Sequence, residues 1–225
     1  MSWYFLRTGQ TRPCSSSKGQ HIIAALLIVF ITIALVAVAY TWGLPLMRKR
    51  QDAAKVSRLS NYFSAYNENS LMKKIEYIAN NGGEETFTLD VDGWWVLHEY
   101  IEASSQNNSV EFNTFSRESN IAVGVGWISP GESCPPDKGK IGTNNPWVVC
   151  ARADSAGEGF NIKYDVWFRE LEESLEKGYK IQLIKNPVGP LSSTGSRIRI
   201  SRERVYTDTS TGKTLIITEI KILLE

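Results

Sequence analysis

The sequence has few of the residues on which most catalytic and metal sites depend. Its 225 residues include two histidines, His21 and His98, and three cysteines, none of them in a C-x-x-C pair. Zinc sites take histidine and cysteine at short spacings, so the chain is poor in zinc ligands. The motifs G-x-S-x-G and H-E-x-x-H and the phosphate-binding P-loop are also missing. We therefore predict no cofactor, no metal and no enzymatic activity.

Two weaker chemical signals leave alternatives open. Asp90 and Asp92 could together bind a cation, but the pattern D-x-D-G is also ordinary turn chemistry. His98 could serve a surface-anchored enzyme only if a concave site or an acidic pair surrounded it. The simpler interpretation is that His98 is an exposed or packed residue at the end of a strand.

Charge of one sign is not in excess either. Lys and Arg number 25 and Asp and Glu 24, so we expect no nucleic-acid partner. A single basic cluster stands out, and it consists of Arg197, Arg199, Arg202 and Arg204. An anionic partner would fit this cluster. Acidic residues lie close by in the sequence, so a salt-bridged sheet surface is the favoured interpretation.

Charge is entirely missing from residues 22–47, a run of 26 residues. About 20 apolar residues cross the hydrocarbon core of a bilayer as a helix, and this run is apolar on every side. It is too long for the apolar core of a cleaved secretory signal. Tyr40 and Trp42 suit the headgroup layer. We predict a transmembrane helix over residues 20–47, kinked or ended at Gly43 and Pro45.

The residues before this helix carry a resemblance to a known family. Residues 1–19 are basic and acid-free, and they end in Lys18-Gly19, followed by Gln20. This motif, placed directly before an apolar helix, resembles the class III signal peptides of archaeal type IV pilins and archaellins. The resemblance covers about residues 18–47. It implies that a prepilin-type peptidase cuts after Gly19 and leaves the helix on the mature chain.

The resemblance also implies a function. Type IV pilin-like proteins hold their apolar helix in membrane lipid and bury it against other subunits when a filament assembles. We therefore expect membrane lipid, the peptidase and other copies or other pilin-like subunits as partners. The expected role is a subunit or minor component of a cell-surface filament, for adhesion or as an appendage. The alternative is an unprocessed single-pass membrane protein whose β-domain binds a ligand or a partner.

The location of the C-terminal domain depends on signals that conflict. Arg48-Lys49-Arg50 follows the span, and basic flanks favour the cytoplasm. Removal of the leader with Cys14 would leave Cys134 and Cys150, a pair that suggests a disulfide in an exported domain, although two free thiols remain an alternative. Asn107 begins an N-x-S sequon, a candidate glycosylation site. We predict that the domain lies outside the cytoplasm.

Residues 48–82 predict an amphipathic helix. Apolar residues from Val56 to Ile78 recur mostly at steps of three and four, and Asn80 to Gly83 form a stop signal. The apolar face would pack on the following sheet. With the apolar helix it would form one long helix, as the resemblance implies. A juxtamembrane signalling helix is the alternative.

Residues 83–225 read mostly as strands. Asp92-Gly93 predicts a hairpin between residues 85–91 and 94–98. Residues 169–177 predict a short helix. The other expected strands are 109–115, 121–128, 147–151, 161–168, 180–184 and a closing hairpin of 197–206 with 215–223. The fold class predicted is α+β, a long N-terminal transmembrane-plus-amphipathic helix followed by a mainly antiparallel β-sheet or sandwich.

Overall fold

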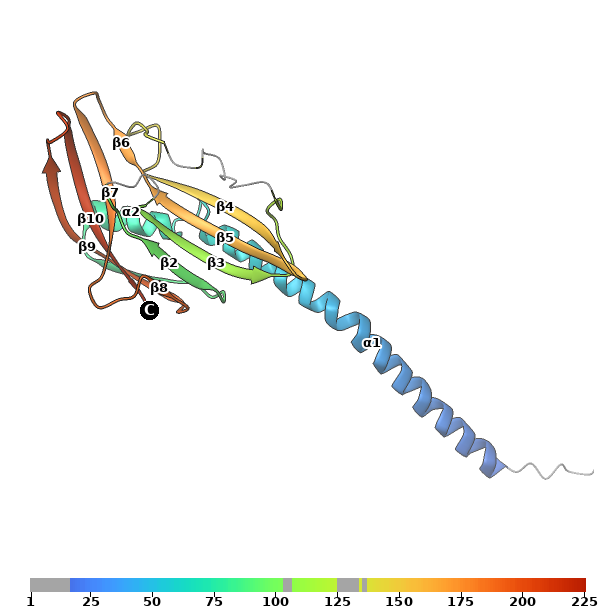
Figure 1. Cartoon of the computed structure of the whole chain (residues 1–225). Helices are drawn as coiled ribbons and strands as arrows, with labels where there is room; N and C mark the ends of the chain where they lie inside the picture. The colour runs from blue at the N-terminus through green and yellow to red at the C-terminus, as the bar shows by residue number, and fades with distance from the viewer. Residues whose placement is uncertain (1–16, 103–106, 125–133, 135–136) are drawn as a thin grey trace, which may run out of the picture. The chain divides into compact units, whose positions relative to one another are not determined.

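The computed structural model describes residues 17–102, 107–124, 134 and 137–225, with side chains from residue 21 onward (Figure 1). The chain forms two compact units, Met1–Arg48 and Lys49–Glu225. The helices are α1 (Ser17–Tyr62) and α2 (Leu71–Asn81). The strands are β1 (Glu84–Thr88), β2 (Trp94–His98), β3 (Ser109–Ser116), β4 (Trp147–Ala156), β5 (Gly159–Phe168), β6 (Glu170–Glu172), β7 (Lys177–Lys185), β8 (Ser192–Ser193), β9 (Arg197–Asp208) and β10 (Thr214–Leu224).

The first unit contains the apolar part of α1. This helix is long and apolar enough to cross a membrane, and its most apolar stretch is not buried by any other part of the described chain. The hydroxyls of Thr32 and Thr41 donate to the carbonyls of Ile28 and Ala37, one turn earlier, at 2.7 and 3.0 Å. Internal bonding of this kind removes the cost of placing a hydroxyl in an apolar medium.

The helix continues past the residues predicted to end it. Gly43 and Pro45 both lie inside α1, which runs on to Tyr62. A proline removes one backbone donor, while the hydrogen bonds on either side remain. Of the two outcomes predicted for Gly43 and Pro45, an end of the helix is therefore wrong, and a kink stays a prediction.

The single amphipathic helix expected over residues 48–82 is two helices. Between α1 and α2, the Ser64 hydroxyl accepts a hydrogen bond from the Tyr66 N–H at 3.3 Å. The Asn67 side chain accepts from the Asn69 N–H and donates to the Asn61 carbonyl, both at 3.0 Å. Short polar side chains that bond to nearby backbone compete with helical hydrogen bonds. The break therefore falls where these residues cluster.

Two five-stranded sheets form the second unit. Sheet A has the order β1-β9-β10-β7-β6, and sheet B has the order β4-β5-β3-β2-β8. The strand pairs are antiparallel except for β10 with β7. The closing hairpin of β9 and β10 and the predicted α+β class are confirmed.

The hairpin predicted around Asp92-Gly93 does not form. Strand β1 pairs with β9 in sheet A, whereas β2 pairs with β3 in sheet B. The connecting residues Leu89 and Val91 are buried, so the segment crosses the core from one sheet to the other. A Cβ on Gly93 would collide with the Asn113 carbonyl and the Phe112 ring. Close packing, and not a tight turn, therefore requires glycine here.

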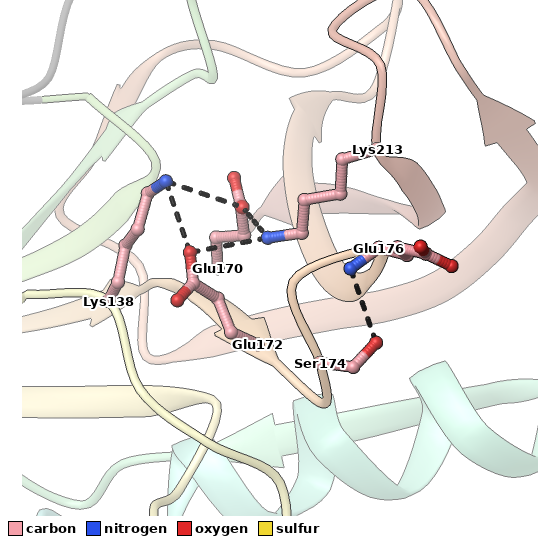
Figure 2. A network of polar contacts seen from close by, with 6 residues as sticks. All are labelled: Lys138, Glu170, Glu172, Ser174, Glu176 and Lys213. Carbon is pink, nitrogen blue, oxygen red and sulfur yellow. Dashed lines mark hydrogen bonds and ion pairs between the residues drawn. The ribbon is translucent and has the colours of Figure 1, made fainter.

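The helix predicted over residues 169–177 is also absent, and strand β6 leads into a turn before β7. Leu171 is 6% exposed and Leu175 is 98% exposed, so the two leucines do not share a buried face as a helix would require. The Ser174 hydroxyl accepts from the Glu176 N–H at 3.3 Å and supports the turn (Figure 2). Pairing of β6 with β7 outweighs the local helix propensity.

The strand predicted over residues 121–128 is not seen in its described part. Residues 121–124 contain a single bridge, from Val123 to Ala153 of β4. The remainder, residues 125–128, lies outside the described residues.

The core of the second unit lies between the two sheets. The Phe63 ring, just after α1, stacks on Tyr164 of sheet B with centroids 4.7 Å apart. Phe87 of sheet A meets Trp95 of sheet B edge-on at 6.1 Å. Helix α2 packs on the β1, β9 and β10 side of this core and buries Ile75 among its apolar residues. Burial of large aromatic side chains dominates the stability of such a core.

Candidate functional site

The candidate processing residues occupy the first turns of α1. Lys18, Gly19 and Gln20 follow Ser17, where the helix begins, and the leader before it lies outside the described residues. Their side chains are likewise outside the description. The apolar surface that follows is exposed at every large side chain from Ile22 to Met47. An uncovered apolar surface of this length needs lipid or other helices around it.

Cys134 and Cys150 form the disulfide that the sequence suggested. Their Cα atoms are 6.1 Å apart, and the loop that they close spans 16 positions. Cys150 is buried in β4, so the bridge fastens Cys134 to this edge strand of sheet B. A staple of this size is worth about 3 kcal/mol in the chain-entropy model.

The sequon at Asn107 is mostly buried. Asn108 is 2% exposed and Ser109 is 0% exposed, while Asn107 is partly exposed. A glycosyltransferase must reach the asparagine together with the Ser hydroxyl. Attachment of a glycan at Asn107 would therefore have to precede folding, and the glycosylation stays a prediction.

The arginine cluster forms ion pairs and a helix cap. Arg204 makes a two-pronged pair with Glu219 at 2.7 and 2.8 Å, and Arg199 lies 2.7 Å from Glu225. The hydrogen-bonded Glu219 carboxylate raises the pKa of Arg204 above the ordinary value for arginine.

Arg202 instead donates to the carbonyls of Ala79 and Asn80, at 3.3 and 3.4 Å, where α2 ends. A cation at a helix C-terminus is favourable. Arg197 is exposed at the start of β9. These contacts support the salt-bridged surface over an anionic-partner patch.

Sheet B contains a buried polar cluster that the sequence did not predict. Only its member His98 was considered above. Glu111 of β3 lies 3.0 Å from Lys163 Nζ and 3.5 Å from His98 Nε2, and it accepts from Asn113 Nδ2 at 2.7 Å. Burial opposes ionisation of Glu111, but the three donors outweigh it and lower its pKa to about 2. The interaction of His98 with the Glu111 carboxylate in turn raises the pKa of His98.

Asp165 lies beside this cluster on β5. It is 3% exposed, and its Oδ1 atom has no hydrogen-bond partner within the described residues. Burial raises the pKa of Asp165 to about 6, with the Ser109 hydroxyl opposing that rise and Glu111 adding to it. Shifted acids often mark catalytic sites. However, three hollows among the described residues, with volumes of about 430, 360 and 610 Å³, have none of His98, Glu111 and Asp165 in their lining.

The largest of these hollows, the sheet-A groove, has a volume of about 610 Å³. Its floor consists of Lys180 and Gln182 of β7, Tyr206 of β9, and Leu215 and Ile217 of β10. Tyr100 and Glu102, which follow β2, add to the wall.

A four-membered ionic network forms another wall of the sheet-A groove (Figure 2). Lys213 Nζ lies 2.7 Å from Glu170 and 3.3 Å from Glu172, and Lys138 Nζ lies 3.9 and 3.2 Å from the same carboxylates. Hydrogen bonds from the two lysines lower the pKa of Glu172. The network ties the loop closed by the disulfide, through Lys138, and the β9–β10 turn, through Lys213, to β6.

No cluster of described residues offers three or more side chains suited to hold a metal ion. Asp90, one of the two aspartates considered above, pairs with Arg58 at 2.8 Å. The carboxylate therefore has a cationic partner from α1.

No known protein family, curated protein or solved structure matches this chain. The function must therefore be argued from the residues and their arrangement.

Proposed function

We propose that this chain is a membrane-anchored, type IV pilin-like surface protein, a subunit or minor component of a cell-surface filament. The observation that carries the proposal is the exposed apolar surface of α1 from Ile22 to Met47. A prepilin-type peptidase would act directly before it, between Gly19 and Gln20.

The physical basis is an exchange of apolar environments. In the membrane, lipid tails surround the apolar surface of α1. In a filament, the same surface is buried against the helices of other subunits. The hydrophobic effect favours this burial over exposure of the surface to water. Thr32 and Thr41 do not oppose either state, because their hydroxyls are bonded within the helix.

The second unit would form the head of the subunit, outside the cytoplasm. The disulfide between Cys134 and Cys150 supports this location, because disulfides persist in oxidising compartments. Arg48, Lys49 and Arg50 favour the opposite orientation by the charge rule. The alternative function is an unprocessed single-pass membrane protein with a ligand- or partner-binding head.

The N-terminal residue and intact mass of the native membrane-associated protein test the proposal. We expect a chain that begins at Gln20 and weighs two hydrogens less than its reduced form. A start at Met1 with free thiols would overturn the proposal and favour a cytoplasmic domain.

A variant pair tests the peptidase step separately. Gly19→Val places a branched side chain at the expected cleavage point and should leave the leader attached. Gly9→Val, within the same leader, is the matched control and should be processed normally. Surface material sheared from the cells is then examined by electron microscopy. Filaments should be present with the wild-type chain and with Gly9→Val, and absent with Gly19→Val.

A further inference from the structure

We propose that the sheet-A groove is a binding site for a neutral oligosaccharide. It lies wholly within Lys49–Glu225, so the inference does not depend on filament assembly. Its volume of about 610 Å³ lies in the usual range for ligand sites.

The floor of the groove offers hydrogen-bonding groups that the protein leaves unused. Gln182 is 6% exposed, and its Oε1 accepts from the Tyr206 hydroxyl at 3.2 Å. Its amide N–H groups have no partner among the described residues. This nitrogen is not among the buried side-chain atoms that lack a partner in the described chain, so its N–H groups reach solvent and can donate to a ligand in the groove.

Apolar and aromatic surface lies beside this amide. Tyr100 and Tyr206 border the groove, and Ile217, 3% exposed, lies in its floor. Lys180 Nζ is 3.8 Å from the centroid of the Tyr100 ring, and the Arg204 guanidinium is 4.8 Å from that of Tyr206. Each cation covers one face of its ring, which leaves the opposite face and the ring edges for a ligand. A sugar ring has an apolar C–H face and a polar rim, which matches rings next to an amide.

The charges that line the groove nearly cancel, because Lys138, Lys180 and Lys213 face Glu102, Glu170, Glu172 and Asp208. Lys138 and Lys213 share Glu170 and Glu172, so the ionic wall contains two cations and two anions. With three lysines against four acidic residues in its whole lining, the groove has little net charge with which to select an anionic or cationic polymer. It does present both donors and acceptors, as sugar hydroxyls require.

The test uses the full chain in lipid nanodiscs, because detergents with sugar headgroups would compete. Maltopentaose, cellopentaose and chitopentaose are the neutral probes, and a heparin octasaccharide is the anionic comparison. Saturation-transfer NMR detects contact, and calorimetry gives the affinity. We expect saturable binding of at least one neutral probe.

Two groove variants, one control and one milder substitute localise the binding. Tyr206→Ala and Gln182→Glu should each weaken it about tenfold, the effect of one lost hydrogen bond to a nearly buried group. Tyr66→Ala removes a tyrosine that is 97% exposed outside the groove and should leave the affinity unchanged. Tyr206→Phe is the milder substitution if Tyr206→Ala impairs folding, and the disulfide mass and unfolding midpoint verify each variant.

Three results would overturn the inference. The first is no saturable binding of any neutral probe at millimolar concentration, and the second is preferential binding of heparin. The third is equal affinity in wild type and the groove variants. None of these results bears on processing at Gly19, so failure here is distinct from failure of the pilin-like proposal.

Discussion

The Oδ1 atom of Asn108 accepts a hydrogen bond from the Leu183 N–H at 2.8 Å. The Nδ2 atom of the same side chain donates to the Ile181 carbonyl of β7 at 2.7 Å and to the Phe168 carbonyl of β5 at 2.8 Å. One buried amide therefore joins the backbones of sheet A and sheet B. Its φ of 91° lies in the left-handed region, which asparagine tolerates better than most residues.

Asn108→Ala should destabilise the head strongly. The substitution leaves three buried backbone groups without their partner and places alanine at a positive φ. We expect a loss of about 3–5 kcal/mol in the free energy of unfolding. Denaturant unfolding of the full chain, followed by tryptophan fluorescence, measures it. Asn161→Ala, an exposed position on β5, should change stability by less than about 0.5 kcal/mol.

Asp165→Asn should stabilise the protein at neutral pH. The pKa of Asp165 rises from 3.8 to about 6 on folding, so the native state binds more protons between these values. Stability is therefore lost as the pH rises through this window, by roughly 2–3 kcal/mol. The substituted amide cannot ionise, so the variant should gain that amount at pH 8 and almost nothing at pH 3.

Glu111→Gln should show the opposite pH dependence. The pKa of Glu111 falls from 4.5 to about 2, so its contribution is complete above pH 4.5 and is lost as the pH falls through 2. The variant should be less stable than wild type at pH 7, and the difference should shrink below pH 3. Thermal unfolding from pH 2 to 8 compares the two variants directly, and parallel curves would contradict both assignments.

Leu171→Ser should destabilise the head by about 2 kcal/mol, because it removes a buried leucine. Leu175→Ser should be nearly neutral, because that side chain is 98% exposed. The pair distinguishes the observed strand and turn from the predicted helix, in which both leucines would lie on one face. Equal losses in the two unfolding curves would favour the helix.

Cys150→Ser should cost about 3 kcal/mol by opening a loop of 16 positions. Reduction of the wild type should reproduce this loss. Cys14→Ser, in the leader, is the matched control and should leave the unfolding curve unchanged. A wild type that is insensitive to reductant would show that the bridge is not a stabilising element.

Local sequence was sufficient for some features. A run of 26 residues without charge determines a membrane-length apolar helix, because no tertiary contact is needed to satisfy its backbone. Alternating apolar residues predicted β9 and β10, since the period of a strand is visible along the chain.

Only the tertiary structure decided which elements pair. Thr86 of β1 lies opposite Arg199, more than 100 positions away, and no local pattern encodes that choice over an adjacent hairpin. Likewise, residues 169–177 do not form a helix, because the pairing of β6 with β7 outweighs their own helix propensity. The sheet-A groove and the role of Asn108 depend on such long-range pairings, because they join side chains and backbones that only the packed sheets bring together. The apolar helix thus follows from local composition, whereas the candidate sites of the second unit follow from long-range packing.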